Sequence, residues 1–265
     1  MENLFAVTYR CIMRRDPGEK VAETHRIVQC WREGQLRIES TEPSESIDTP
    51  GRPDKPILVH PRKLPRRGFH TVEGRAALLH AITHIEFNAI NLALDAVYRF
   101  RDLPIDYYND WLTVADEEAR HFVLLAERLR QLGYEYGDFE AHNGLWDMAV
   151  RTAHDVLIRM ALVPRVMEAR GLDVTPGMIE RFALIDDQRS AGVLRVIMDE
   201  EVGHVAIGSR WFHYFCDQRQ LPREKTYLDL MQHYGKGRVT PPLNREARKA
   251  AGFTGQEIQY LEGLL

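Results

Sequence analysis

The sequence predicts an all-α protein whose centre is an antiparallel four-helix bundle, with an irregular N-terminal arm and a helical C-terminal extension. From about residue 71 to residue 217, apolar residues recur at the three- and four-residue spacing of amphipathic helices. The connections between these helical stretches are short, which is typical of helices packed in a bundle. No strong alternation of apolar and polar residues is present, so we expect no substantial sheet.

The composition is that of a globular protein that folds in water. Hydrophobic residues make up 44% of the 265 residues and charged residues 28%, with a formal net charge of −4. This charge disfavours a generally basic nucleic-acid binder, and no apolar run approaches the ~18 residues of a membrane span. The first residues lack a signal-peptide pattern, and three scattered cysteines indicate no disulfide framework. We therefore expect a cytoplasmic protein that does not enter a membrane.

Two different segments precede the helical region. Residues 1–40 predict one or two short helices, because their apolar residues follow helical spacing. Residues 41–70 contain six prolines, which lack a backbone donor, so we expect an extended, irregular arm. The apolar piece Ile57-Leu58-Val59 is expected to anchor this arm to the body.

Capping residues and helix breakers set the first two long helices. Thr71 is a plausible N-cap for a helix over about 74–101, which Leu103-Pro104 ends. A second helix is expected over about 105–132, ending at Gly133, because glycine accepts the left-handed conformation found after helices. A loop follows.

Proline and glycine interrupt the second half of the helical region. A third helix is expected over about 145–169, before Gly171, with a kink at Pro164. A break is expected at Thr175-Pro176-Gly177. The fourth helical region then runs to the end of the bundle and can be broken near Asp186-Asp187.

The C-terminal residues complete the predicted organisation. Residues 218–265 predict a short helix, a Gly/Pro loop over 235–242 and a terminal helix. We expect one structural domain overall, in which residues 1–70 and this extension pack on a bundle formed by residues 71–217.

The motif Asp-Glu-Glu-x-x-His occurs twice, as DEEARH and DEEVGH. In each copy the second Glu and the His are three residues apart: Glu118 with His121, and Glu201 with His204. On an α-helix this spacing places both side chains on one face, so a carboxylate oxygen and an imidazole nitrogen can reach one metal ion. A single copy is weak evidence, because charged helix residues usually face water.

The other two helices each supply a matching glutamate. Glu86 precedes Glu118 by 32 residues, and Glu168 precedes Glu201 by 33. Four-helix bundles hold two metal ions with this ligand pattern. Apolar neighbours around Glu86 and Glu201 indicate burial, which is costly for a carboxylate without a cation. We therefore predict a dimetal site with six ligands: Glu86, Glu118, His121, Glu168, Glu201 and His204.

Other polar residues leave alternatives open. His80 and His84 lie on a different face of their helix from Glu86, so we expect them to form hydrogen bonds between helices. His154 is expected to be a buried histidine of the third helix, or to line an access channel. Arg165 can pair with a ligand carboxylate or an anionic substrate, or stabilise the kink. The remaining acidic residues of the two motifs can orient a ligand imidazole or face solvent: Asp116, Glu117, Asp199 and Glu200.

Two further groups of residues have ordinary explanations. Four aromatic residues near the expected core are predicted to pack rather than to take part in redox chemistry: Tyr107, Tyr108, Trp111 and Trp211. The basic string over residues 62–67 can contact phosphate, although such a string is usually a solvated arm. We therefore expect no nucleic-acid partner, and keep RNA as an alternative.

From about Trp31 to Phe253 the chain resembles the ferritin-like family catalogued as domain of unknown function 455, with no departure at the six proposed ligands. This resemblance implies a ferritin-like fold and a di-iron or di-manganese carboxylate site. The wider ferritin-like group includes ferritins, rubrerythrins and oxygen-activating hydroxylases, one of which modifies tRNA. The resemblance rests on several strings: Gly51-Arg52-Pro53, His80-Ala81-Ile82-Thr83-His84-Ile85-Glu86, Asp110-Trp111-Leu112, Glu118-Ala119-Arg120-His121-Phe122, Tyr136-Gly137-Asp138-Phe139, His142-Asn143-Gly144-Leu145-Trp146, Glu168-Ala169-Arg170-Gly171-Leu172-Asp173 and Asp199-Glu200-Glu201-Val202-Gly203-His204-Val205.

The expected function is that of a dimetal carboxylate oxidoreductase of the hydroxylase or oxidase type. It would activate dioxygen or peroxide and act on an unidentified small substrate. Iron is the expected metal and manganese the alternative, since both accept carboxylate and imidazole ligands. The first alternative function is a non-enzymatic iron-handling protein. The second is an RNA-modifying hydroxylase, which rests on the basic arm and on fold analogy. The segments around the bundle favour a monomer or dimer over a storage shell.

Overall fold

The fold was analysed in a computed structural model, which describes residues 1–39, 43–65, 68–234 and 239–264. The prediction of an all-α protein is confirmed. Within the described residues the only strands are two short ones that pair in parallel, β1 (Glu2–Asn3) and β2 (Leu36–Arg37).

The chain divides into two compact units, Met1–Val150 and Arg151–Leu265. The boundary lies within helix α5 (Gly144–Arg151). A single structural domain with a four-helix bundle over residues 71–217 stays a prediction.

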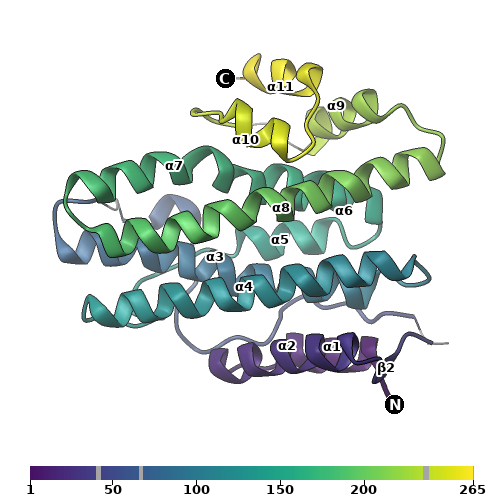
Figure 1. The fold of residues 1–265 in the computed structure, drawn as a ribbon, viewed down its shortest axis with the longest axis horizontal. Coiled ribbons are helices and arrows are strands. Elements are labelled where there is room, and N and C mark those ends of the chain that lie inside the picture. The colour runs from purple at the N-terminus through teal and green to yellow at the C-terminus, as the bar shows by residue number, and fades with distance from the viewer. Residues whose placement is uncertain (40–42, 66–67, 235–238, 265) are drawn as a thin grey trace. The chain divides into compact units, whose positions relative to one another are not determined.

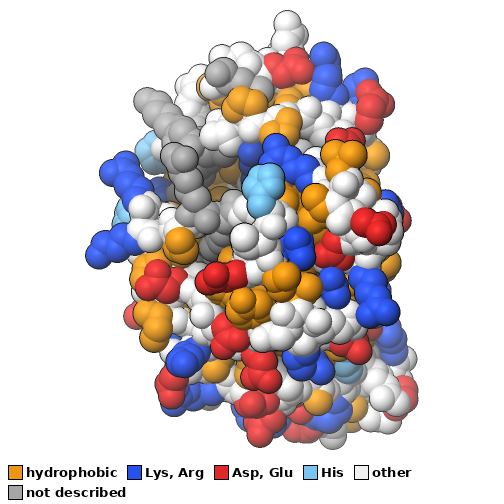
Figure 2. All heavy atoms as spheres, turned by 90° about the vertical axis from the view of Figure 1, so that its left-hand side faces the viewer, with side chains coloured by type: hydrophobic (Ala, Val, Ile, Leu, Met, Phe, Trp, Pro, Cys, Tyr) orange, Lys and Arg blue, Asp and Glu red, His pale blue; other side chains and the backbone are white. Residues whose placement is uncertain are grey.

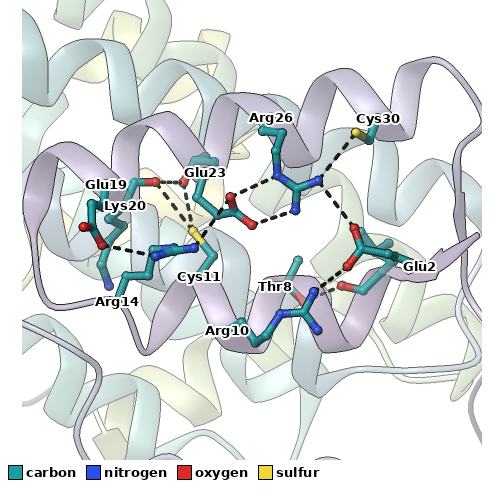
Figure 3. A network of polar contacts seen from close by, with 12 residues as sticks. Glu2, Thr8, Arg10, Cys11, Arg14, Glu19, Lys20, Glu23, Arg26 and Cys30 are labelled. Atoms are coloured by element: carbon teal, nitrogen blue, oxygen red, sulfur yellow. Dashed lines mark hydrogen bonds and ion pairs between the residues drawn. The ribbon is translucent and has the colours of Figure 1, made fainter.

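The first unit begins with two short helices, α1 (Leu4–Ile12) and α2 (Pro17–Arg32). They confirm the helices predicted within residues 1–40. Asn3 and Asp16 cap them, because their side chains accept hydrogen bonds from backbone N–H groups in the first turn of each helix. Figure 3 shows ion pairs along this part of the chain: Arg10–Glu2, Arg14–Glu19 and Arg26–Glu23.

Where the structure describes it, the arm is irregular, as predicted, apart from one 3-10 turn, η1 (Pro61–Lys63), and an isolated β-bridge at Leu58. The predicted anchor at residues 57–59 is confirmed. Val59 N–H donates to the carbonyl oxygen of Ala141 (2.8 Å), and Ala141 N–H donates to that of Ile57 (3.1 Å). These two bonds tie the arm to the segment that precedes α5.

Two long helices form the centre of the first unit, α3 (Val72–Arg99) and α4 (Ile105–Gln131). Thr71 caps α3 as predicted, because its hydroxyl accepts a hydrogen bond from Gly74 N–H (3.0 Å). Gly133 follows α4 in the left-handed conformation, with a φ of 84°. The short connection between the helices makes a hairpin, with α1 packed on α3 and α2 on α4 (Figure 1).

The prediction of one helix over residues 145–169 is wrong. After α5 the chain forms a turn, and Asp155 then caps a new helix by accepting hydrogen bonds from the N–H groups of Leu157 and Ile158. His154 lies in that turn and is exposed, so the expectation of a buried histidine in the third helix is wrong. The region after α5 consists of three consecutive elements: α6 (Val156–Leu162), the π-helix η2 (Val163–Glu168) and α7 (Ala169–Leu184). Pro164 therefore lies in a widened turn instead of a simple kink.

The break predicted at residues 175–177 is also wrong, because α7 continues through Pro176. Proline leaves the carbonyl oxygen four residues earlier without its helical donor. In this protein the side-chain amide of Asn244 donates to that oxygen, on Leu172 (3.1 Å). The break near Asp186-Asp187 is confirmed, since α7 ends there.

The longest helix of the second unit, α8 (Gln188–Gln218), packs against α6, η2 and α7. Gly208 passes so close to Pro164 that an added Cβ would lie 2.3 Å from its ring. The C-terminal residues form α9 (Arg223–Tyr234), α10 (Arg245–Ala250) and α11 (Gly255–Glu262). Two helices thus stand where the sequence predicts one terminal helix. Residues 235–238 of the predicted Gly/Pro loop lie outside the described residues.

No helix in the described residues is long and apolar enough to cross a membrane. All three cysteines are free thiols, which agrees with the absence of a disulfide framework. Basic and acidic side chains are interspersed over the face drawn in Figure 2. In the basic string, Arg62 and Lys63 are exposed, and residues 66–67 lie outside the described part of the chain.

Candidate metal centre

Helices α3 and α4 bring together three of the six predicted ligands. His121 Nδ1 lies 3.4 Å from Glu118 Oε2 and 3.5 Å from Glu86 Oε2. One ligand atom from each of these residues lies within 4.8 Å of the other two. Glu118 and His121 are fully buried, and Glu86 is 3% exposed. The three side chains can therefore hold a metal ion within the first unit.

The local sequence explains why these side chains meet. Glu118 and His121 are one turn apart on α4, so they share a face. On α3, Glu86 lies at helical spacing from the buried residues Leu79 and Ile90. The apolar stripe that drives α3 to pack on α4 thus carries the carboxylate inward.

Electrostatics make this cluster unusual. Burial alone would lower the pKa of His121, but the neighbouring carboxylates of Glu118 and Glu86 raise that pKa to about 11. A protonated imidazole then neutralises part of the buried negative charge. A divalent cation would compensate this charge more fully, and its binding would displace the proton from the imidazole.

The second unit holds the other three predicted ligands. Glu201 and His204 are one turn apart on α8, with His204 Nδ1 3.6 Å from Glu201 Oε1. Glu168 is the last residue of the π-helix η2, against which α8 packs. His204 is 1% exposed, and both glutamates are 9% exposed. These ligand-type side chains are therefore also buried.

The other acidic residues of the two motifs differ from one another. Asp116 accepts a hydrogen bond from His25 (2.6 Å) and lies 3.4 Å from Arg32, so it ties α4 to α2. Asp199 is exposed, and Glu117 and Glu200 are partly buried. The structure thus assigns Asp116 a contact between helices.

His80 and His84 of α3 form hydrogen bonds with the loop that follows α4. His80 Nε2 accepts a hydrogen bond from Gly137 N–H (2.9 Å). His84 Nδ1 lies 2.9 Å from the Tyr136 hydroxyl, and its Nε2 lies 3.2 Å from the carbonyl oxygen of His142. Burial lowers the pKa of His84 to about 3, so the imidazole is neutral at pH 7. The expected hydrogen bonds are present, but their partners lie in the loop after α4 instead of in another helix.

Sequence reasoning missed Lys20, which is fully buried. Its ammonium donates to the carbonyl oxygens of Ile12 (2.7 Å) and Gly51 (3.0 Å) and to Asn91 Oδ1 (2.5 Å). Burial lowers its pKa to about 7, whereas three acceptors around one nitrogen favour the ammonium form. The sequence feature that indicates its burial is its position four residues before Thr24, on the buried face of α2.

The remaining residues singled out in the sequence have structural roles. Arg165 pairs with Glu257 (2.7 Å), a residue of α11, instead of with a ligand carboxylate. The four aromatic residues are buried in packing contacts, as expected: Tyr107, Tyr108, Trp111 and Trp211.

The fold and the site define an all-α protein with a buried carboxylate–histidine cluster on two adjacent helices. The chain belongs to the family described as "Protein of unknown function (DUF455)", whose model matches residues 13–259. It is 49% identical over 216 residues to an "Uncharacterized protein" of Haemophilus influenzae (strain ATCC 51907 / DSM 11121 / KW20 / Rd), covering 79% of this chain and 75% of that protein. No solved structure matches the chain.

Proposed function

We propose that this protein is a dimetal carboxylate oxidoreductase that activates dioxygen or peroxide, with iron as the metal. The buried cluster of Glu86, Glu118 and His121 carries the proposal, because a buried set of oxygen and imidazole donors suits a metal ion. Glu168, Glu201 and His204 are proposed to complete one site, since they repeat the same ligand order at nearly the same spacing.

Charge supports two ions instead of one. The six proposed ligands include four carboxylates and two imidazoles. Two divalent cations neutralise four carboxylates when both imidazoles are neutral. Charges at these buried positions need such compensation, because desolvation of an uncompensated carboxylate costs several kcal/mol, on the order of the stability of a whole domain.

The chain itself would orient the ligands around the metal ions and keep water away from them. Glu118 and Glu201 would bind on the same helical faces as His121 and His204, and Glu86 and Glu168 would be terminal or bridging ligands. The buried apolar residues around Glu86 exclude water from the centre. A bound pair of iron ions would supply the redox chemistry.

Oxygen uptake tests this function. Protein loaded with ferrous iron without air should consume dioxygen when air and a reductant are added. Glu118→Gln should abolish the uptake, because it removes a buried ligand. Glu127→Gln is the matched control, since Glu127 is exposed on the same helix. Uptake that is absent from the iron-loaded native protein, or unchanged in Glu118→Gln, would contradict the proposal.

The course of the uptake separates an oxidoreductase from an iron-handling protein. Repeated turnover with reductant and formation of an oxidised organic product would support the oxidoreductase. A single round of uptake that leaves ferric iron on the protein, with no organic product, would favour iron handling.

A further inference from the structure

A small cavity in the second unit is lined by hydrogen-bond donors. Its wall includes Arg165 of η2, Arg170 of α7, Tyr227 of α9 and Arg248 of α10. The centre of a water-sized sphere has about 10 Å³ in which to lie, so the cavity has room for at least one such sphere. The cavity can therefore hold a small ion or molecule beside these donors.

Three donors in this wall lack an acceptor among the described residues: Arg165 Nη1, Arg248 Nη1 and the Tyr227 hydroxyl. Each of the three side chains is at most 3% exposed. Buried donors without acceptors are rare in proteins because their desolvation is not repaid. Three of them around one cavity indicate a missing acceptor.

The Nε and Nη2 atoms of both guanidinium groups already donate hydrogen bonds within the protein. Arg165 Nη2 donates to Glu257 Oε2 (2.7 Å), and its Nε donates to the Ser209 hydroxyl (3.1 Å). Arg248 donates to both carboxylate oxygens of Asp173, at 3.0 and 2.7 Å. Neither guanidinium can therefore rotate to find an acceptor elsewhere without breaking these bonds.

The charges around the cavity do not balance. The guanidinium groups of Arg165, Arg170 and Arg248 face two carboxylates, Asp173 and Glu257, which leaves one positive charge in excess. Uncharged aromatic rings surround the Arg165 guanidinium carbon at 4.3 to 4.8 Å: Phe212, Tyr227 and Phe253. These rings attract the cation but are weak hydrogen-bond acceptors.

We propose that this cavity binds one small monovalent anion, chloride in the cell, through Arg165, Arg248 and Tyr227. A chloride ion can accept all three hydrogen bonds and cancels the excess charge. A water molecule has two lone pairs and no charge, so it would leave one donor and the excess positive charge without a partner. Because Arg165 belongs to η2, the anion would also hold the turn that ends at Glu168.

Bromide identifies the ion directly, because it replaces chloride and scatters anomalously. Crystals grown in sodium bromide should give an anomalous bromine peak in contact with Arg165, Arg248 and Tyr227. A water molecule at this position and no bromine peak would overturn the proposal.

Thermal unfolding tests the same site in solution. Tm is measured in sodium chloride and in sodium gluconate at equal ionic strength, on protein as purified. At a chloride concentration of ~10 times Kd, chloride should raise Tm by about 3 °C. Tyr227→Phe should remove most of this rise, and Tyr214→Phe, on partly buried Tyr214 of the same unit, should keep it. Equal Tm values in the two salts, or an unchanged rise in Tyr227→Phe, would overturn the proposal. None of these outcomes depends on the metal content.

Discussion

The two halves of the proposed metal site carry the same residues in the same order on different backbones. Glu86 lies within the uninterrupted helix α3, whereas Glu168 ends a π-helix that contains Pro164. His121 lies within 3.5 Å of two carboxylates in its own unit, and His204 lies 3.6 Å from Glu201. The first half therefore has its ligands gathered by regular helix packing.

The difference shows that a repeated ligand pattern does not imply a repeated environment. A π-helix is less regular than an α-helix, and such turns are frequent at functional sites. In the second unit this turn depends on neighbours, because Gly208 of α8 leaves room for Pro164. We therefore expect the two halves to respond differently to equivalent substitutions.

The largest expected difference concerns the two histidines in metal-free protein. His121→Ala removes a cation from beside two buried carboxylates and should lower the free energy of unfolding by about 3–5 kcal/mol. His204→Ala should cost less, about 1–2 kcal/mol, because Glu201 retains some contact with solvent. Urea unfolding in a chelator at pH 6 measures both.

The pH of that experiment follows from the sign of the pKa shift. The folded-state pKa of His121 is about 11, above the unfolded value of about 6.5. Its stabilising contribution is fully present below pH 6.5 and is lost as pH rises through 11. Equal losses for the two variants at pH 6 would show that the halves are electrostatically alike.

A smaller effect is expected where the π-helix meets α8. Gly208→Ala would bring a methyl group against Pro164, so the free energy of unfolding should fall by about 1–3 kcal/mol. Gly203→Ala is the matched control on the same helix, since nothing lies within 4 Å of its added Cβ. It should leave stability unchanged or raise it by about 0.5–1 kcal/mol, because alanine favours helix. Chemical unfolding compares the two, and a Gly208→Ala protein as stable as the control would refute the close packing.

The smallest expected change in the free energy of unfolding distinguishes Asp116 from Asp199, the first residues of the two Asp-Glu-Glu-x-x-His motifs. Burial alone would raise the pKa of Asp116, but the hydrogen bond with His25 and the charges of His25 and Arg32 lower it. Asp116→Asn should cost about 0.5 kcal/mol, whereas Asp199→Asn, on an exposed residue, should cost nothing measurable.

The pH dependence of this small effect has a defined sign. The folded pKa of Asp116 lies below its unfolded value, so its contribution is present above about pH 4 and is lost as pH falls through the folded pKa. Thermal unfolding between pH 3 and pH 7 tests this. A cost for Asp116→Asn that grows as pH falls from 4 to 3 would contradict the contact with His25 and Arg32.

The sequence was most informative where the determining contacts are local. Thr71 and Gly133 act within one turn, so the ends of α3 and α4 were predicted closely. The course of α7 could not be predicted, because the donor for Leu172 comes from Asn244, 72 residues away. The partner of Arg165, Glu257, lies 92 residues away. Contacts of this range are fixed by tertiary packing, which a pattern of nearby residues does not contain.

The candidate site shows the same division. Glu118 with His121, and Glu201 with His204, follow from helical periodicity alone, and the structure has both pairs. Bringing Glu86 to His121 requires α3 to pack on α4, and the apolar stripe on α3 indicates this. The π-helix that carries Glu168 has no comparable signal beyond Pro164, because proline predicts a distortion but not its form.

The number and place of bound metal ions test the central claim most directly. Protein produced in iron-supplemented cells should contain two metal ions per chain by elemental analysis. Anomalous scattering should place both ions among Glu86, Glu118, His121, Glu168, Glu201 and His204. Glu118→Gln should lose metal, and Glu127→Gln should keep both ions. One ion or none per chain, or metal bound by residues of one unit alone, would contradict a shared dimetal site.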